Sequence, residues 1–173
     1  MFRLSFLVLA LVMLTACSSL QSTKTDTKIS KQYSWVLLPI VNHTDTSQAS
    51  LKAEAILQAL LASKGVTQLK IYPAEMNNDS LFQPNDRKSV DHAMTWAKSE
   101  GARYAITGSI EEWQYKVGID GEPVVGLTLR VIDLSNQAVV WSSVGAKSGW
   151  SRSALSGVAQ ELIKELLASL PIE

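Results

Sequence analysis

The residues of this chain that could perform chemistry are few and widely spaced. Its 173 residues include two histidines, His43 and His92, and one cysteine, Cys17. These are too few for the ligand set of a zinc site, and a single cysteine cannot form an internal disulfide. The sequence places no titratable partner beside His43, and His92 lies in a predicted helix, so we expect both to be solvated surface residues. The sequence therefore predicts no metal site and no cofactor.

Two further patterns fail as catalytic motifs. Glu111 and Glu112 are adjacent in a predicted strand, where neighbouring side chains point to opposite faces, so they form a poor general acid and base pair. The run from Gly145 to Ser148 resembles part of a phosphate-binding loop but lacks the leading glycine and the spacing of that motif. The sequence contains no G-x-S-x-G, HExxH or GxGxxG motif. We therefore predict that the protein is not an enzyme.

The residues before Cys17 predict that this cysteine is modified by lipid. Arg3 precedes an apolar stretch of eleven residues, Leu4 to Leu14, and Thr15 and Ala16 then lead into Cys17. This stretch is too short to cross a bilayer, which takes about 20 residues, and the pattern is typical of a bacterial lipoprotein signal peptide with its lipobox. We predict that residues 1–16 are removed and that Cys17 carries a diacylglyceryl group and a further acyl chain such as palmitate, a stable membrane anchor. An ordinary cleaved signal peptide and a membrane anchor helix are the alternatives.

The residues after the cysteine predict the compartment and the domain organisation. Ser18 and Ser19 follow Cys17 without an acidic residue, a pattern typical of lipoproteins sorted to the outer membrane, where we expect the protein on the periplasmic face. Residues 17–31 are rich in Ser, Thr and Lys, so we predict a lipidated flexible tether. Residues 32–173 are of the size of one domain.

In this domain, segments with the hydrophobic pattern of a strand alternate with segments that have the pattern of a helix. The apolar run Tyr33–Val41 predicts a buried strand, and apolar residues at helical spacing from Ala53 to Leu61 predict a helix that Gly65 ends. Short turns at 118–123 and 134–137 join three strands, which are therefore antiparallel. The predicted strands are Tyr33–Val41, Val66–Tyr72, Tyr104–Val117, Val124–Ile132 and Ala138–Val144, and the predicted helices are Ala53–Lys64, Ser89–Glu100 and Ala154–Leu170. The order βαβαβββα predicts an α/β fold, a mixed sheet with helices on both faces in an αβα sandwich.

Charge is balanced over the chain but concentrated in one turn. With 16 basic and 16 acidic residues the chain lacks the basic footprint of phosphate-backbone binding, so we expect no nucleic-acid partner. Between Glu111 and Glu122, four acidic residues accompany only Lys116, a net charge of −3. In a ring of many copies such charges would add and attract polycations. In a single copy the same stretch is an ordinary soluble hairpin.

Aromatic residues gather in the second half of the chain. Trp150 lies with Gly149 and Arg152 in a loop before the last helix, where no strand or helix period buries it. It is therefore either a cap on the core or an anchor at the headgroup level of a membrane. The other aromatic residues of this part are Trp113, Tyr115 and Trp141.

Several of these motifs together resemble the PelC family, outer-membrane lipoproteins of Pel exopolysaccharide export systems. The resemblance runs across nearly the whole domain. It rests on the lipobox, Tyr33–Pro39 followed by Asn42-His43-Thr44, Gly101–Tyr104 leading to Thr107–Ile110, and Gly149–Arg152 followed by Leu155–Ala159. More distantly, Arg103–Ser109 and Val131–Trp141 are similar to CsgG, the curli secretion channel, and to activator lipoproteins of penicillin-binding proteins.

The resemblance implies a non-enzymatic homo-oligomer, a dodecamer-like ring that guides a cationic polysaccharide to the outer-membrane porin PelB during biofilm formation. It implies an acidic lining, to which we assign Asp120 and Glu122, and a membrane-proximal belt, to which we assign Trp150 and Arg152. The six-residue and four-residue turns are too short to cross a bilayer, so a separate partner must form the pore. The alternative is a monomeric periplasmic lipoprotein that activates a cell-wall synthase, against which the short tether argues.

Overall fold

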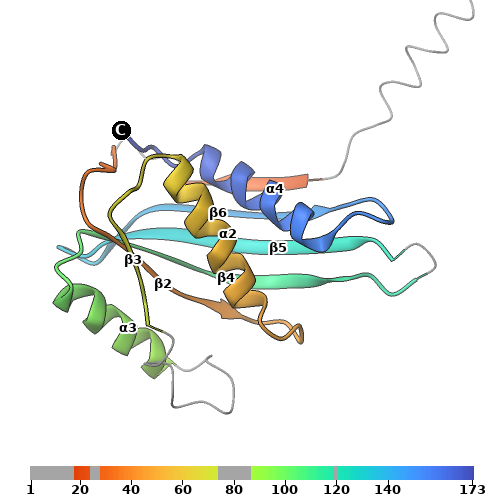
Figure 1. The fold of residues 1–173 in the computed structure, drawn as a ribbon, viewed down its shortest axis with the longest axis horizontal. Coiled ribbons are helices and arrows are strands. Elements are labelled where there is room, and N and C mark those ends of the chain that lie inside the picture. The colour runs from red at the N-terminus through yellow and green to blue at the C-terminus, as the bar shows by residue number, and fades with distance from the viewer. Residues whose placement is uncertain (1–17, 24–27, 74–86, 119–120) are drawn as a thin grey trace, which may run out of the picture.

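The computed structural model describes residues 18–23, 28–73, 87–118 and 121–173 (Figure 1). The predicted signal peptide at 1–16, the predicted lipidation site Cys17 and the predicted lining residue Asp120 lie outside the described residues. The elements are β1 (Ser18–Ser22), β2 (Trp35–Asn42), α2 (Ala49–Ser63), β3 (Leu69–Ile71), α3 (Arg87–Ser99), β4 (Tyr104–Tyr115), β5 (Pro123–Asp133), β6 (Ala138–Ser148) and α4 (Leu155–Ala168). In the described part of the chain, no helix has the length and apolar character that crossing a membrane requires.

One six-stranded sheet, in the order β1-β6-β5-β4-β2-β3, forms the centre of the fold. Strand β2 runs parallel to β3 and β4, whereas β4, β5, β6 and β1 are antiparallel to their neighbours. The parallel strands are those joined by helical crossovers, and the antiparallel strands β4 to β6 are those joined by short turns. The predicted α/β fold with a mixed sheet is confirmed, with β1 as an additional edge strand.

Helices cover the two faces of this sheet unequally. Helices α2 and α4 lie side by side over one face, and α3 lies on the other (Figure 1). The larger core lies under α2 and α4 and contains three fully buried tryptophans, Trp35, Trp113 and Trp141. Under α3 a smaller cluster packs Val36 and Leu38 of β2 against alanines of the helix. Helices on both faces are therefore confirmed, but α3 covers only the β2 side of its face.

Helix α2 is fixed to the sheet by two polar contacts besides its apolar face. The register of β2 shifts between Leu37 and Ile40, which frees the Ile40 N–H from the strand ladder. That N–H donates a hydrogen bond of 2.9 Å to Oε1 of Glu54 on α2. Burial raises the pKa of Glu54 above its usual value, against the opposing effect of this hydrogen bond. Ahead of the helix, the Thr46 hydroxyl donates to the Trp113 carbonyl at 2.5 Å, which sets the helix start at the level of Trp113 on β4.

The prediction of a flexible tether over residues 17–31 is wrong for the part that the structure describes. Ser18–Ser22 forms β1, with Ser18 opposite Lys147 of β6. Further along, Ile29 is fully buried and pairs with the C-terminal segment. Backbone hydrogen bonds to β6 stabilise β1, and its side chains are polar or exposed, so a hydrophobicity pattern does not reveal such an edge strand.

Candidate functional site

Three segments that the sequence separates meet at one end of the sheet. The start of β1 pairs with the end of β6, because Ser18 lies opposite Lys147. The Gly149 N–H donates to the Pro123 carbonyl at 2.8 Å, so the loop before α4 lies beside the start of β5. We call this region, residues 115–118, 121–123 and 148–153, the hairpin end; it lies at the right of Figure 1. It contains the predicted belt residues and Glu122.

The loop before α4 combines a tightly packed Gly149 with an exposed Trp150. A Cβ atom on Gly149 would lie 2.6 Å from Cγ2 of Val158 and 2.9 Å from Cγ of Pro123, so only glycine fits at this position. The Trp150 side chain itself is 68% exposed. This exposure excludes the interpretation of Trp150 as a cap on the core. Arg152 is exposed in the same loop and adopts a left-handed backbone, with φ of 80°.

Tyr115 and Val117, which sequence reasoning left unassigned, are further exposed apolar side chains at the hairpin end. Tyr115 is 50% exposed and Val117 has no contact that shields it from solvent. The Tyr115 hydroxyl accepts a hydrogen bond of 3.1 Å from the Leu155 N–H, which joins the end of β4 to the start of α4. The sequence could have indicated the exposure of Val117, because this residue precedes Gly118 in a turn, where an apolar side chain has little to pack against.

The predicted acidic residues do not form one cluster. Glu122 is half-exposed at the hairpin end, and its carboxylate lies 3.7 Å from Nζ of Lys116. Glu111 and Glu112 lie further along β4 and project on the face of the sheet that α3 leaves uncovered. The described acidic groups between residues 111 and 122 therefore occupy two places, the hairpin end and this sheet face.

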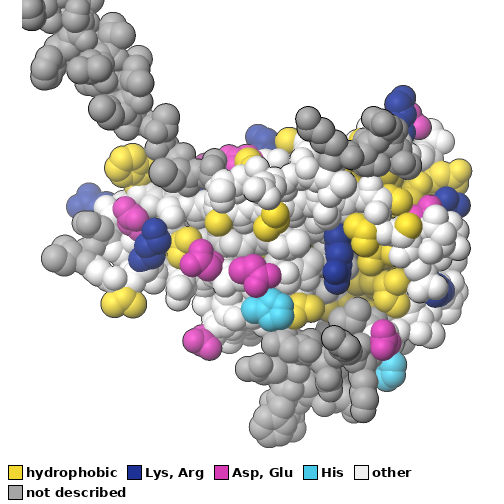
Figure 2. Space-filling model, turned by 180° about the vertical axis from the view of Figure 1, so that it is seen from behind, with side chains coloured by type: hydrophobic (Ala, Val, Ile, Leu, Met, Phe, Trp, Pro, Cys, Tyr) yellow, Lys and Arg dark blue, Asp and Glu magenta, His cyan; other side chains and the backbone are white. Residues whose placement is uncertain are grey.

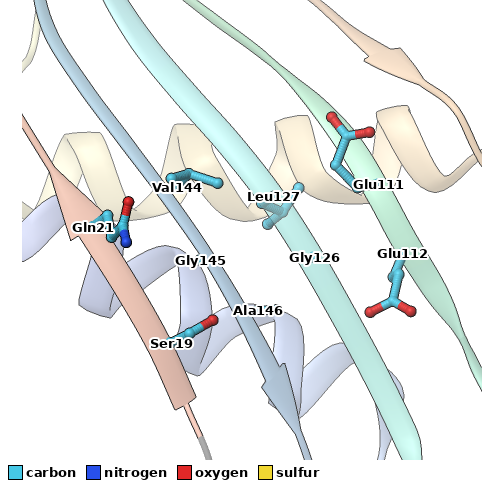
Figure 3. A pocket seen from close by; sticks show the side chains of 9 residues that line it. All are labelled: Ser19, Gln21, Glu111, Glu112, Gly126, Leu127, Val144, Gly145 and Ala146. Carbon is cyan, nitrogen blue, oxygen red and sulfur yellow. The ribbon is translucent and has the colours of Figure 1, made fainter.

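The prediction that Glu111 and Glu112 point to opposite faces is wrong. The register of β4 against β5 shifts between Ile110 and Glu112, and this bulge breaks the alternation of side chains. As a result, both glutamates line one hollow of about 280 Å³ (Figure 3). The Ser109 hydroxyl donates to Oε1 of Glu111 at 2.6 Å. The floor and far wall of the hollow are Ser19, Gln21, Gly126, Leu127, Val144, Gly145 and Ala146.

A second hollow of about 370 Å³ continues the first toward the hairpin end. The two share Ser19, Glu112 and Ala146, and the second reaches Lys116 and Ser148. Together they form a shallow trough along the part of this face that α3 does not cover. We call this part the open face; Figure 2 shows the molecule from this side. Small and polar side chains line most of this trough, which suits it to a protein surface or an extended ligand rather than to an enclosed small molecule.

The other residues singled out from the sequence lie in a strand, on a helix and in an exposed loop. Lys147 lies in strand β6, and its Nζ contacts Glu165 at 2.5 Å and Glu161 at 2.9 Å, both on α4. The hydrogen bond to Glu165, ahead of the opposing effect of burial, raises the pKa of Lys147. The run from Gly145 to Ser148 is thus a strand and not a loop at a helix start. His43 is exposed after β2 and His92 is exposed on α3, and the described residues contain no group of three or more His, Cys, Asp or Glu side chains arranged for a metal ion.

Solved structures resemble this chain over most of its length. No family model and no curated protein matches it. The PelC dodecamer from Paraburkholderia phytofirmans is 38% identical, with 91% of this chain and 99% of that chain covered and a TM-score of 0.76. A single-substitution variant of that dodecamer is 39% identical, with 91% and 100% covered and a TM-score of 0.77. The lipoprotein GNA1162 from Neisseria meningitidis shares the fold at 19% identity, 78% and 96% coverage and a TM-score of 0.54.

At this identity and coverage the two PelC structures are relatives and not only examples of a shared architecture. Each alignment covers 91% of this chain and nearly all of the PelC chain. The chain therefore belongs to the PelC family.

Proposed function

We propose that this protein is a non-enzymatic lipoprotein of Pel exopolysaccharide export, in which a homo-oligomeric ring guides the cationic polymer to the outer-membrane porin PelB. The observation that carries the proposal is the identity of 38–39% to PelC dodecamers over 91% of the chain. The ring stands on the periplasmic face of the outer membrane, where its lipid anchors and exposed aromatic residues meet the bilayer.

The position of β1 supports this membrane orientation. Cys17 is bonded to Ser18, and Ser18 lies opposite Lys147 of β6. The proposed acyl chains are therefore attached directly beside the hairpin end, with no flexible linker between them and the sheet. The exposed side chains of Tyr115, Val117 and Trp150 lie at that same end. Tryptophan and tyrosine favour the headgroup level of a bilayer, and Arg152 next to them suits anionic headgroups. The proposed lipid anchor and the exposed aromatic side chains therefore lie at the same end of the protein.

A longer connection between lipid and β1 tests this orientation. We expect an insertion of about ten Gly and Ser residues between Ser18 and Ser19, with a root-mean-square span of about 17 Å, to release the hairpin end from the bilayer. Quenching of tryptophan fluorescence by brominated lipids in vesicles measures the depth of Trp150 in a Trp96→Phe background, because the other three tryptophans, Trp35, Trp113 and Trp141, are fully buried, whereas Trp96 on α3 is only partly buried. Quenching should fall, while the same ten residues added after Glu173 leave it unchanged. Undiminished quenching in the first variant contradicts the proposed orientation.

The acidic turn supports the proposed contact with the polymer. Glu122 lies at the hairpin end, near the proposed membrane surface, and Asp120 precedes it in the sequence between β4 and β5. A single copy attracts a cation weakly, because the Debye length is about 8 Å at physiological salt. In a ring the turns of neighbouring copies come close and their potentials add, which concentrates a polycation near the opening.

Neutral substitutions in this turn test the polymer-guiding role. We expect Asp120→Asn combined with Glu122→Gln to lower Pel export severalfold in cells, with an unchanged amount of folded, lipidated protein. Secreted polymer is measured by lectin binding or by the mass of biofilm matrix. The matched control is Asp91→Asn, since Asp91 is exposed on α3 on the other side of the sheet. Full export by the doubly neutral variant contradicts a role of these carboxylates in guiding the polymer.

A further inference from the structure

We propose that β1 detaches from the sheet as a unit, stays off it while enzymes act on Cys17, and pairs with β6 only afterwards. The inference rests on the proposed function, because it takes the lipid anchor on Cys17 from there. We call the observed pairing of β1 with β6 the docked state. Docking is then the step that follows lipid attachment and removal of the signal peptide. Two features support this order, the weak attachment of β1 and the firm attachment of the next described segment.

Strand β1 is held through its backbone and not through buried side chains. It is an edge strand, and β6 is the strand with which it pairs. The side chains of residues 19–22 are exposed, including that of Leu20 at 44%. At its end, Thr23 bonds to Ser142 from N–H to carbonyl at 2.9 Å and between the two hydroxyls at 2.8 Å. A strand that buries no side chain has a low local stability, so it opens without unfolding of the core.

The next described segment is fixed to the core independently of β1. Ile29 is fully buried and belongs to the larger core. Its N–H donates to the Pro171 carbonyl at 2.9 Å, and its carbonyl accepts from the Glu173 N–H at 3.2 Å. The indole N–H of Trp35 donates to the Ser30 carbonyl at 3.2 Å. Detachment of β1 therefore stops at Ile29 and leaves the domain folded.

The docked state leaves no room for an enzyme at Cys17. Ser18 follows Cys17 directly and lies opposite Lys147 in the sheet. One residue spans about 3.5 Å, whereas a single helix is about 10 Å across, so the wall of an active site does not fit between Cys17 and the sheet. When β1 is detached, the 11 residues Ser18–Lys28 reach up to about 38 Å from Ile29. That reach separates the folded domain from the membrane in which the proposed lipid attachment takes place.

Two glycines separate the docking of β1 from the folding of the domain. In the docked state β1 runs close beside Gly145 of β6 (Figure 3). A Cβ atom on Gly145 would lie 2.8 Å from the Ser19 carbonyl oxygen, 2.7 Å from Cδ2 of Leu20 and 3.3 Å from Cδ1 of Leu162. The two shortest distances are to β1, so alanine at this position disfavours the docked state, while the end of the Leu162 side chain can shift slightly. On the neighbouring strand β5, a Cβ atom on Gly126 would lie 3.4 Å or more from its neighbours, an ordinary contact.

Hydrogen exchange of the full-length lipidated protein in mild detergent tests whether β1 detaches on its own. We expect the β1 amides to exchange at least about tenfold faster than the amides of Ile29 and Glu173. Gly145→Ala should raise the β1 rate by about a further tenfold and leave the rate at Ile29 unchanged. The matched control Gly126→Ala should change neither rate. Joint loss of protection at β1 and Ile29, or a β1 rate that Gly145→Ala does not alter, overturns the proposal.

A disulfide across β1 and β6 tests the order of the steps. The Thr23 N–H donates to the Ser142 carbonyl, so the pair before it, Ser22 and Ser143, is a non-hydrogen-bonded pair of the ladder. The Cα atoms of such a pair lie about 4.5 Å apart, a distance that a disulfide spans. Ser22→Cys combined with Ser143→Cys therefore locks the docked state when the two thiols are oxidised.

The rate of signal-peptide removal is then measured on the purified full-length precursor, with the disulfide confirmed by peptide mass. Bacterial membranes supply the phospholipid donor and the processing enzymes. We expect the oxidised double variant to be processed about tenfold or more slowly than the same variant after reduction, because the competent, detached state is removed. The two single variants are the controls and should be processed at the wild-type rate.

The outcomes separate this order of steps from the predicted lipid anchor. Slow processing that reduction restores supports docking after modification of Cys17. Equal rates for the oxidised and the reduced double variant overturn that order and leave the proposed export function in place. A wild-type precursor that the membranes do not process overturns the predicted lipid anchor, and with it this inference, and is thereby distinguished from failure of the order alone.

Discussion

Replacing Gly108 with alanine is expected to destabilise the folded protein by about 3 kcal/mol or more, or to prevent folding. Gly108 lies in the central strand β4, opposite Leu129 of β5 and Ile40 of β2. A Cβ atom there would lie 2.0 Å from the carbonyl oxygen of Thr128. That oxygen belongs to the backbone of β5, so relief requires a shift of the strand and not of a side chain. Urea unfolding of the detergent-extracted protein, followed by tryptophan fluorescence, measures the loss.

Gly157 provides the control for this substitution. It lies in the first turn of α4, and a Cβ atom built on it has no atom within 4 Å. Alanine restricts the unfolded chain and favours the helix, so Gly157→Ala should stabilise the protein by about 0.5 to 1 kcal/mol. An unfolding midpoint of Gly108→Ala equal to that of the wild type contradicts the close approach of β4 and β5 at this position.

Replacing Asp133 with alanine is expected to cost about 3 kcal/mol of folding stability. The Asp133 side chain is only 9% exposed and ends β5. It accepts hydrogen bonds from the backbone N–H and the hydroxyl of Ser135, at 2.9 and 2.6 Å, and from the Arg103 guanidinium at 2.7 Å. Its loss leaves the turn between β5 and β6 without its cap and the guanidinium without its carboxylate. Asp45→Ala, in an exposed loop, should change the stability by less than about 0.5 kcal/mol.

The same carboxylate makes stability depend on pH. Burial alone raises the pKa of Asp133, but the hydrogen bonds from Ser135 and Arg103 outweigh it and hold the pKa below its usual value. A carboxyl group with a lowered pKa in the folded state stabilises the protein above its unfolded pKa of about 3.9, and the stabilisation is lost as the pH falls through and below that value. The difference in unfolding free energy between wild type and Asp133→Asn should therefore be larger at pH 7 than near pH 3.5. An equal difference at the two pH values contradicts this role of Asp133.

Alternating hydrophobic periods predicted most of the fold from the sequence. The run Tyr33–Val41 covers β2 except for its last residue Asn42, the helical spacing from Ala53 to Leu61 lies within α2, and Ala154–Leu170 contains α4. These segments were predictable because each buries one stripe or face, and burial leaves a periodic trace in the sequence. The two short turns likewise predicted the antiparallel order of β4, β5 and β6. Strand β1 leaves no such trace, since backbone pairing with β6 and not side-chain burial stabilises it.

The candidate site depended more on the tertiary structure. The sequence identified Glu122 in an acidic turn and Trp150 with Arg152 in a different loop, and it left open whether Trp150 is buried. Only the structure brings the turn and the loop together at the hairpin end. The structure shows Trp150 exposed, in a loop whose Gly149 N–H is bonded to the Pro123 carbonyl at the start of β5. The common face of Glu111 and Glu112 is decided by a bulge, which depends on how β4 pairs with β5.

By itself, the sequence determined the α/β class, the lipoprotein pattern around Cys17 and the residues that build the core. These follow from local composition and from periodic burial, which each segment carries within itself. Only the tertiary structure decided that β1 pairs with β6, so that Ser18 lies beside the hairpin end, and that Glu111 and Glu112 lie on the sheet face opposite α2 and α4. Such relations join residues that are far apart in the chain, and a one-dimensional pattern does not contain the distances between them.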